Sequence, residues 1–326
     1  MKNKNIIILV VLISMIIITI TIYYQTKKSL PKKLTINQAI TENIFYPCFN
    51  ENSTIYLSDQ GIILYKYDFL KNQKSKLLED EILGVLNAVC SNDLSKIIFY
   101  NNYPENQIIS YNLTDKKYKI LNKNIRQFIF DNNSNDIYYI YSDRLRNIYT
   151  LNKSKSDGSD WKKLIDLPES SIDYQMQTIN NNIFLISKDI YKYDTQSNKL
   201  DKLLNLKISD NVIISKDGDL IVYNEFDKNT SIYNIKTNKS TELSTSFNLK
   251  QAIFSENGEY IYYLKDLENL VQLDTKSLKQ KTISLDNSNI NYTNLLDDNI
   301  SNLFISKDDL VLYFTHNYRL YFIKLK

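Results

Sequence analysis

Histidine is nearly absent from this chain, which has one, His316, among 326 residues. Lyases and metalloenzymes that hold a metal through histidines at a central site need several such side chains. The G-x-S-x-G and H-E-x-x-H motifs are also missing. We therefore predict no catalytic residue, no metal site and no cofactor, and we expect His316 to be a surface or loop residue.

Glycine and proline are scarce too, with five and four residues, and the net charge is only +3. Tight turns with so little glycine must rely on asparagine and aspartate, which tolerate the left-handed backbone. Lysines alternate with Asp and Asn instead of forming a basic stripe, and the pI of about 8.4 is low for a nucleic-acid-binding domain. We expect no nucleic-acid partner.

A repeat organises the chain, and it is clearest in residues 254–263, FSENGEYIYY. This segment reads as the end of a strand, an Asn-Gly turn and an aromatic strand. The first apolar residue after each related turn recurs in steps of 42, 40, 46, 38, 40 and 50 residues. A period of about 40–45 residues with several strands per unit is typical of β-propeller blades. These landmark residues are Ile55, Ile97, Ile137, Ile183, Ile221, Ile261 and Val311.

Each unit also has a third strand, such as LYKYD at 64–68, and ends in a short outer segment, such as KLL at 76–78. The last unit stops after its third strand, whereas residues 34–40 form a spare strand at the start. Pairing 34–40 with 319–326 would close the ring without an open edge. We predict an all-β domain over 32–326, a propeller of about seven four-stranded blades, with six or eight blades as alternatives.

The units resemble the TolB-like, WD40-type propeller repeat, whose pattern is F-S-P-D-G, an apolar strand, then Y-x-x-D, a turn and L-T. The similarity extends over residues 44–326 and concerns architecture. This chain has no Pro in its hairpin turns, and Asn or Ser replaces Gly in most copies. The resemblance implies a propeller without specifying a function.

The N-terminal region contains one long apolar segment, residues 6–24, after a tail at 1–5 and before a linker at 25–31. A helix of this length spans roughly 28 Å, close to the hydrocarbon thickness of a bilayer. The apolar core is longer than that of a cleaved signal peptide, and no A-x-A site follows it. We predict an uncleaved signal-anchor helix, with the lipid bilayer as its partner.

The orientation of this helix depends on two opposing signals. Four lysines between 27 and 33 outnumber Lys2 and Lys4, which would hold the domain in the cytoplasm. A short tail before a first apolar segment usually stays inside, and we favour that reading. The chain is then a single-pass cell-membrane protein with an extracytoplasmic propeller. Its high content of Lys, Asn and Ile indicates a bacterium with an AT-rich genome.

Two enlarged loops could carry binding, because long loops on a rigid scaffold often do. Residues 153–163 contain the only tryptophan, Trp161, and residues 287–300 contain Tyr292. The alternative for each is a longer connection, with Trp161 packed over a blade edge. No residue in either loop is assigned a binding role from the sequence.

The two cysteines, Cys48 and Cys90, occupy equivalent positions in the first two units. A disulfide needs Cα atoms within about 7 Å, and adjacent blades often lie farther apart. We favour two small buried thiols. The acidic segments 131–136 and 217–219 lack the spacing of an EF-hand, and we interpret them as hairpin turns.

Three classes of function compete. We favour a non-catalytic binding or scaffold module for a protein or glycan at the cell envelope, because a propeller offers exposed faces without chemistry of its own. The first alternative is an envelope enzyme, a polysaccharide or peptide hydrolase or lyase. The second is a ligand sensor that works through a membrane partner. The sequence does not identify the ligand.

Overall fold

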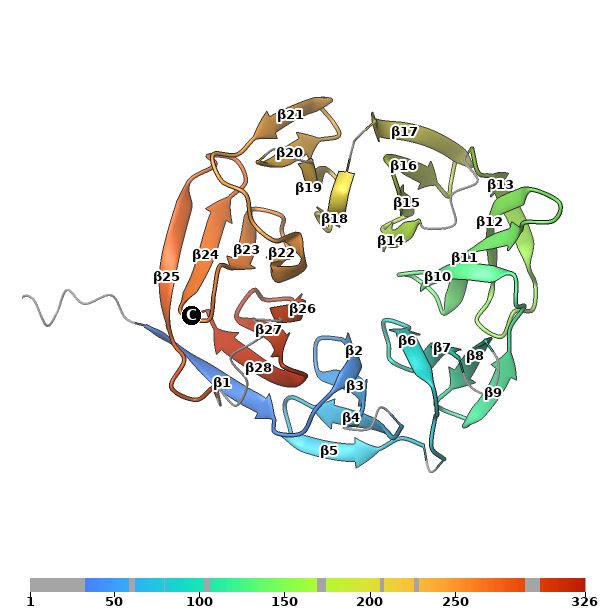
Figure 1. Ribbon diagram of the computed structural model, residues 1–326, viewed down its shortest axis with the longest axis horizontal. Coiled ribbons are helices and arrows are strands. Elements are labelled where there is room, and N and C mark those ends of the chain that lie inside the picture. The colour runs from blue at the N-terminus through green and yellow to red at the C-terminus, as the bar shows by residue number, and fades with distance from the viewer. Residues whose placement is uncertain are drawn as a thin grey trace, which may run out of the picture.

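In a computed structural model, the strands form a closed ring around a central axis (Figure 1). The structure describes residues 33–58, 62–78, 80–102, 106–168, 174–205, 208–225, 229–290 and 300–325. Five separate four-stranded sheets and one eight-stranded sheet follow one another around this ring. The eight-stranded sheet contains two blades that share an edge, so the fold is an all-β propeller of about seven blades.

Blades 1 to 3 each consist of four consecutive antiparallel strands, ordered from the axis outward. They are β2 (Phe45–Phe49), β3 (Ser53–Leu57), β4 (Leu64–Asp68) and β5 (Gln73–Lys76); β6 (Val85–Cys90), β7 (Lys96–Asn101), β8 (Gln107–Asn112) and β9 (Lys117–Ile120); and β10 (Ile125–Phe130), β11 (Asp136–Asp143), β12 (Ile148–Lys155) and β13 (Lys162–Asp166).

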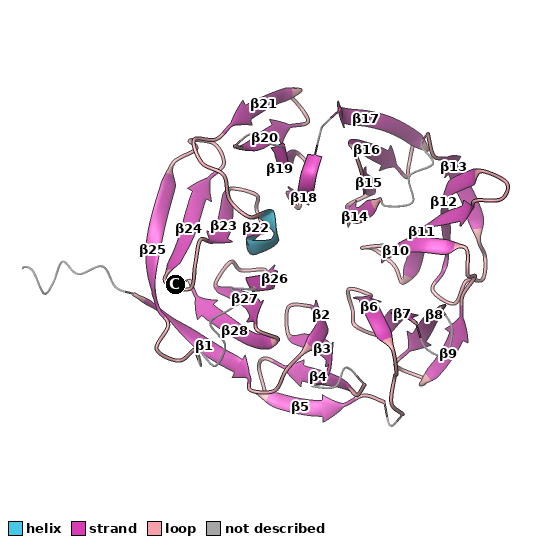
Figure 2. Ribbon diagram, viewed as in Figure 1, coloured by secondary structure: helices cyan, strands magenta, loops and turns pink. Residues whose placement is uncertain are grey.

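Blades 4 to 6 repeat this order, and a single 3-10 turn, η1 (Leu249–Gln251), precedes blade 6 (Figure 2). Their strands are β14 (Gln175–Ile179), β15 (Asn182–Ile186), β16 (Asp189–Asp194) and β17 (Lys199–Asn205); β18 (Ile208–Ile214), β19 (Leu220–Glu225), β20 (Thr230–Asn234) and β21 (Lys239–Glu242); and β22 (Ala252–Phe254), β23 (Tyr260–Leu264), β24 (Asn269–Asp274) and β25 (Gln280–Asp286).

Blade 7 is built from both ends of the chain. It contains β26 (Ile300–Ile305), β27 (Val311–His316) and β28 (Arg319–Lys324), and β1 (Leu34–Ile40) is its outermost strand. β1 pairs antiparallel with β28, with Ile36 opposite Ile323, which is the seam that the sequence predicts. It also pairs parallel with β25 of blade 6, with Leu34 opposite Leu285, and this second pairing was not anticipated.

The hydrophobic core lies between the blades. Each of the seven clusters of buried side chains in the described part of the chain joins two neighbouring blades. The six isoleucines among the repeat landmarks are at most 1% exposed, because each lies near the start of a second strand and packs in a cluster shared with a neighbouring blade. Val311, in blade 7, is only partly buried. The regular spacing of the landmark residues therefore reflects the packing of neighbouring blades against each other.

Asparagine supplies much of the left-handed backbone in this chain. Of the fourteen described non-glycine residues with positive φ, seven are asparagines. Asn72, Asn198 and Asn238 each take this conformation in the turn between a third and a fourth strand. The expected reliance on asparagine is confirmed at these turns.

No helix within the described ranges is long and apolar enough to cross a membrane. The predicted tail (1–5), membrane segment (6–24) and linker (25–31) all lie outside the described residues.

Candidate active site at the axial mouth

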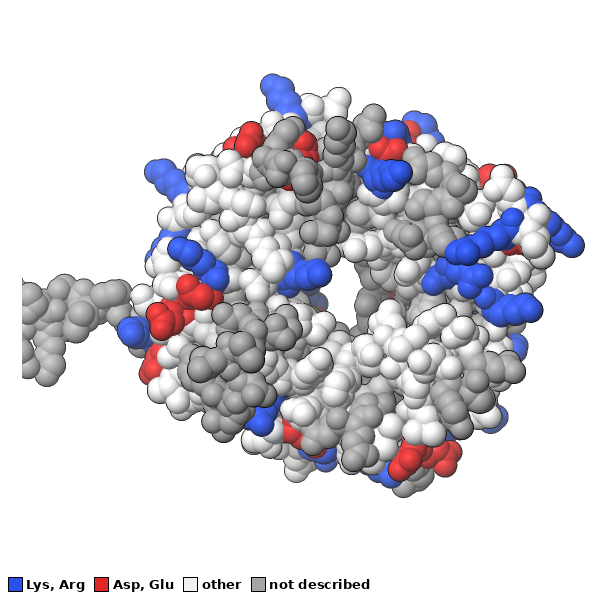
Figure 3. Space-filling view, in the orientation of Figure 1, with Lys and Arg blue, Asp and Glu red and all other residues white. Residues whose placement is uncertain are grey.

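One end of the ring opens into a cavity of about 730 Å³ around the axis, called here the axial cavity. Its walls come from the ends of the innermost strands and from the turns that follow them. The space-filling view from one side shows an opening at the centre of the ring (Figure 3). All seven blades contribute, in order through Phe49, Cys90, Phe130, Gln177, Ile214, Glu256 and Phe304.

Charged side chains line the half of this cavity that blades 5, 6, 7 and 1 provide. Lys216 forms an ion pair with Glu256 on the next blade. Lys307 Nζ lies 3.2 Å from Glu51 Oε1, again across a blade boundary. Between these pairs, the Glu256 backbone N–H donates to Asp309 Oδ1 at 2.8 Å. Two lysines and two glutamates therefore alternate along this arc.

Neutral amides line the other half. Asn92 Nδ2 donates to the Asn132 carbonyl oxygen at 3.0 Å, which ties blade 2 to blade 3. Asn132 donates in turn to the carbonyl of Thr178 on blade 4. Asn180 Nδ2 donates to the Asp217 carbonyl at 3.4 Å, which reaches blade 5. Each contact satisfies polar groups of two blades at once.

A disulfide links blades 1 and 2 at the mouth. Cys48 and Cys90 are bonded, with their Cα atoms 6.0 Å apart. The expectation of two unpaired thiols is wrong, because the innermost strands converge near the axis and bring these Cα atoms within the range of a disulfide. One contact of this kind, covalent or polar, now links every pair of neighbouring blades around the mouth.

A recurring turn positions the side chains at the mouth. In blade 5, Ser215 Oγ donates to Asp217 Oδ1 at 2.5 Å and accepts the Leu220 backbone N–H at 2.9 Å. The serine and the aspartate hold the turn, so the residue between them, Lys216, is left to face the cavity. Blades 2, 6 and 7 have the same arrangement, with a serine followed two residues later by Asp93, Asn257 and Asp308.

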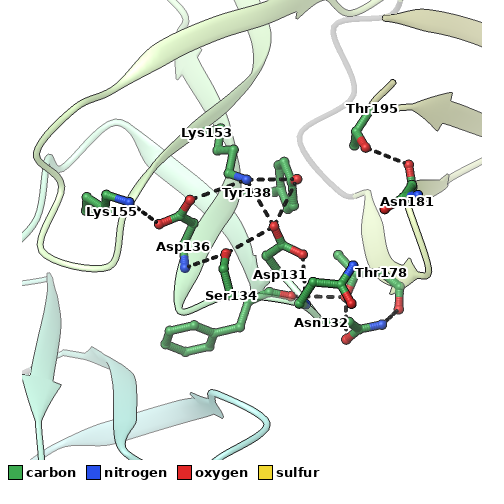
Figure 4. A network of polar contacts seen from close by, with 12 residues as sticks. Asp131, Asn132, Ser134, Asp136, Tyr138, Lys153, Lys155, Thr178, Asn181 and Thr195 are labelled. Atoms are coloured by element: carbon green, nitrogen blue, oxygen red, sulfur yellow. Dashed lines mark hydrogen bonds and ion pairs between the residues drawn. The ribbon is translucent and has the colours of Figure 1, made fainter. Parts of the chain in front are cut away.

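The turn of blade 3 is built differently (Figure 4). Asp131 replaces the serine and is only 9% exposed. Its Oδ2 accepts hydrogen bonds from Lys153 Nζ at 3.0 Å, Ser134 Oγ at 3.1 Å and Tyr138 Oη at 3.3 Å. Lys153 also lies 3.3 Å from Asp136 Oδ2, so one ammonium group balances two carboxylates.

The protonation states of this network follow from burial and hydrogen bonding together. Burial alone would raise the pKa of Asp131, but the Asn133 N–H and Lys153 outweigh it and hold the pKa below its usual value. Burial alone would lower the pKa of Lys153, but its hydrogen bonds to Asp131 and Tyr138 raise it. Burial raises the pKa of Tyr138 as its largest cause. Asp131 and Lys153 are therefore a charged pair at neutral pH, and the Tyr138 phenol beside them is neutral.

The residues singled out in the sequence do not converge on the axial cavity. His316 is 3% exposed at the end of β27, so the expectation of a surface or loop residue is wrong. Trp161 is 67% exposed at the end of the β12–β13 loop, directly before β13, so it does not pack over the blade edge. Most of 287–300, including Tyr292, lies outside the described residues. The acidic segments 131–136 and 217–219 are hairpin turns, as expected.

The residues that do line the mouth were missed, although a sequence signal marks them. Lys216, Glu256, Lys307 and Asn92 each directly follow the serine of the repeated turn. Asn132 directly follows Asp131, which replaces that serine. Because these side chains differ in type, no single motif identifies them, and only the aligned repeats would.

Comparison with known proteins supports the fold. No protein-family model and no curated protein sequence matches this chain. Among solved structures, oligogalacturonate lyase from Vibrio parahaemolyticus aligns with 90% of this chain and 98% of its own, with a TM-score of 0.62 and 11% identity. An oligogalacturonate lyase in complex with manganese aligns with 91% of this chain and 98% of its own, with a TM-score of 0.61 and 10% identity.

These neighbours overturn one reading of the sequence. Both similar structures are enzymes, which contradicts the prediction of a non-catalytic binding or scaffold module and the prediction that the chain is not an enzyme. The prediction required a recognisable motif or several histidines, whereas the side chains that line the mouth come from all seven repeats. At 10–11% identity the likeness itself shows the fold alone.

The described side chains do not fit a manganese ion. No group of three or more His, Cys, Asp or Glu that could hold a metal occurs within the described ranges. The carboxylates that line the axial cavity, Glu51 and Glu256, are each paired with a lysine, and Cys90 is in the disulfide. We therefore derive no reaction step through a metal.

Proposed function

We propose that this chain is an extracytoplasmic enzyme that cleaves a uronic-acid polysaccharide by elimination in the axial cavity. The observation that carries the proposal is the pairing of Lys216 with Glu256 and of Lys307 with Glu51 around one cavity of about 730 Å³. A cavity of this size is ordinary for a small-molecule or oligosaccharide site. The similarity in fold to two oligogalacturonate lyases supports the substrate class.

The two ion pairs suit a substrate that carries its own carboxylate. A uronate entering the cavity can replace Glu256 as the partner of Lys216, or Glu51 as the partner of Lys307. The lysine then neutralises the uronate carboxylate and stabilises the negative charge that develops on the adjacent carbon. The displaced glutamate lies beside the bound sugar with its carboxylate free to accept a proton.

The reaction proceeds without water as a reactant. The glutamate takes the proton from the carbon next to the uronate carboxylate, and the electron pair of that C–H bond forms a C=C bond. The C–O bond to the neighbouring sugar breaks, and its oxygen takes a proton from a lysine ammonium group or from solvent. The products are a shortened chain and a sugar with an unsaturated ring.

Glu256 and Lys216 give the sharpest test of this mechanism. In the full-length protein, Glu256→Gln and Lys216→Met should each lower kcat/KM on polygalacturonate about a hundredfold, which is typical for loss of an acid–base or charge-stabilising group. The measurement is the ultraviolet absorbance of the unsaturated product. Glu268→Gln and Lys239→Met, which change exposed residues away from the cavity, should leave the rate within about twofold.

Two results would overturn the proposal. One is the absence of cleavage over a panel of uronic-acid polysaccharides that includes polygalacturonate and alginate. The other is the release of reducing ends without an unsaturated product, which would mean hydrolysis.

The extracytoplasmic location is part of the same proposal. Disulfides persist in oxidising compartments, so the Cys48–Cys90 bond supports a domain outside the cytoplasm. The apolar segment 6–24 is proposed to anchor the chain in the cell membrane, with the bilayer as its partner and an envelope glycan as substrate. Alkaline phosphatase fused after Lys326 should be active. Activity of a reporter that works only in the cytosol would reverse the orientation.

A further inference from the structure

A second cavity of about 580 Å³ lies between blades 2 and 3, away from the axis, and is called here the distal groove. The turn at 131–136 separates it from the axial cavity. Asn132 and Asn133 in this turn line the axial cavity, whereas Ser134 and Asn135 line the distal groove. The two cavities are thus adjacent, with a single turn as their common wall.

The walls of the distal groove are tied together across the blade boundary. Asn135 Nδ2 on blade 3 donates to Asp93 Oδ2 at 3.1 Å and to Ser95 Oγ at 3.2 Å on blade 2. On the outer side, Lys119 Nζ lies 3.6 Å from Asp157 Oδ2 in the β12–β13 hairpin. A Cβ on Gly158 would lie 3.2 Å from Leu121 Cδ2, so this hairpin sits directly on blade 2.

The shared wall is held at both ends by ion pairs. Lys153 holds Asp131 at one end of the turn and Asp136 at the other, at 3.0 and 3.3 Å (Figure 4). Lys155 adds a second contact to Asp136 at 3.0 Å. The groove therefore exists before any ligand binds, which reduces the ordering that binding requires.

The chemistry of the distal groove favours an anionic sugar. The groove is lined by four lysines and three aspartates, and the aspartates already have partners: Asp136 has Lys155, Asp157 has Lys119, and Asp115 accepts the Lys117 backbone N–H at 3.2 Å. Among the described residues, the ammonium groups of Lys96 and Lys117 have no ion-pair partner. Two cations are therefore available to a ligand.

An aromatic ring stands beside these cations. Tyr118 lines the groove, is 62% exposed, and lies 5.3 Å from Tyr111 between ring centroids. A supported, exposed ring offers an apolar face with a polar tip, which suits the mixed surface of a sugar. Hydroxyls and amides such as Ser134 and Asn135 complete the lining.

We propose that the distal groove is a subsite for uronate units of the same polysaccharide chain whose reacting bond lies in the axial cavity. This inference rests on the proposed function, because it assigns the groove to the same substrate. An extended polymer that passes over the 131–136 turn can occupy both cavities at once. Lys96 and Lys117 pair with its carboxylates, and Tyr118 packs against a sugar ring.

The test compares long and short substrates. In the full-length protein, the double variant Lys117→Met/Tyr118→Ala should raise KM for polygalacturonate about fivefold, the loss expected for one exposed ion pair and one ring contact. The kcat for this polymer and the KM for digalacturonate should not change, because the dimer occupies the axial cavity alone. Lys239→Met is the matched control, and thermal unfolding checks that the variants are folded. An equal change for polymer and dimer, or none for either, would overturn the subsite.

A binding measurement separates this inference from the proposed function. Labelled polygalacturonate is titrated into the parent protein and into the Lys117→Met/Tyr118→Ala variant, and its anisotropy is followed. If the variant binds the polymer about fivefold more weakly while neither protein cleaves it, binding of the polymer in the distal groove is supported and the lyase proposal is wrong. If cleavage occurs and the two proteins bind the polymer equally, the lyase proposal is supported and the distal groove is not a subsite.

Discussion

The ring is closed at its rim by strand pairing and at its mouth by single contacts between turns. At the rim, β1 pairs with both β28 and β25 and buries Ile36 completely. At the mouth, apart from the Cys48–Cys90 bond, neighbouring blades share hydrogen bonds or ion pairs, and the glutamates and lysines of those pairs are partly exposed. Exposed ion pairs contribute about 0–1 kcal/mol each.

The difference assigns stability of the fold to the rim and the proposed chemistry to the mouth. The rim and the inter-blade clusters hold the fold, so the side chains at the mouth can exchange partners with a ligand without opening the ring. The Cys48–Cys90 disulfide is the exception at the mouth, because it fixes blades 1 and 2 covalently beside the cavity. The predictions below test this division.

Removing the rim strand should have the largest effect. Deletion of residues 33–40 should abolish cooperative thermal unfolding, because β25 and β28 would lose the strand between them. Ile36→Ala should cost about 3 kcal/mol as a large-to-small core substitution, whereas Asn37→Ala in the same strand should cost less than about 0.5 kcal/mol. Urea unfolding measures both. If the deletion and the parent melted at the same temperature, the rim would not be what holds the ring.

The disulfide should come next. Cys48→Ser/Cys90→Ser should lower the free energy of unfolding by about 2–4 kcal/mol, because the crosslink closes a long loop in the unfolded chain. The two cysteines are 42 residues apart. Urea unfolding of the parent with and without a reductant gives the same comparison, and the double variant should not respond to the reductant. A parent that is equally stable when reduced would contradict the expectation.

Lys153→Met should destabilise the chain by about 2 kcal/mol, because it leaves the buried Asp131 carboxylate without its cation. The value is below that for a fully buried pair, since the Lys153 side chain is 23% exposed. Lys155→Met is the matched control, because Lys155 is 56% exposed and contacts only Asp136 in the same network. Its cost should be below about 0.5 kcal/mol. Equal losses would mean that Asp131 does not need the charge of Lys153.

The smallest expected effect is on pH dependence. The pKa values of Asp131 and Asp93 are lowered in the folded state, for Asp93 because hydrogen bonds from Ser91, Ser95 and Asn135 outweigh burial, which alone would raise it. Their contribution to stability is therefore complete above the unfolded pKa of about 3.9 and is lost as the pH falls through the lower folded values.

Urea unfolding midpoints measured from about pH 5 down to about pH 2 should fall as these carboxylates take up protons. Asp93→Asn should have a shallower fall over the same range than the parent. An Asp93→Asn profile parallel to that of the parent would show that the hydrogen bonds to Asp93 do not favour its charged form.

The architecture could be predicted from the sequence because it is repeated. Each isoleucine landmark packs in a cluster with a neighbouring blade, so one packing requirement recurs about every 40 residues and its period is visible. The spare strand at 34–40 could be matched to the last unit for the same reason. Its parallel pairing with β25 could not be predicted, because nothing in the repeat pattern places the closing strand of blade 7 beside the outer strand of blade 6.

The candidate site could not be predicted in this way. Glu51, Lys216, Glu256 and Lys307 are far apart in the sequence and come together only when the ring closes. The Cys48–Cys90 distance likewise depends on how near the axis the innermost strands lie. Short motifs report chemistry carried by one segment, whereas this mouth takes its side chains from all seven repeats.

The recurring turn, Ser-x-Asp or Ser-x-Asn, has a further consequence for how such a protein can change over generations. Its first and third residues keep the hairpin folded, so a substitution at the middle residue alters the mouth while leaving the scaffold intact. The middle position of this turn differs in type between four blades of the same fold, where it is Lys216, Glu256, Lys307 and Asn92. A new preference for charge or size around the axis can therefore arise one point mutation at a time, from separate parts of the gene, without passing through an unfolded intermediate.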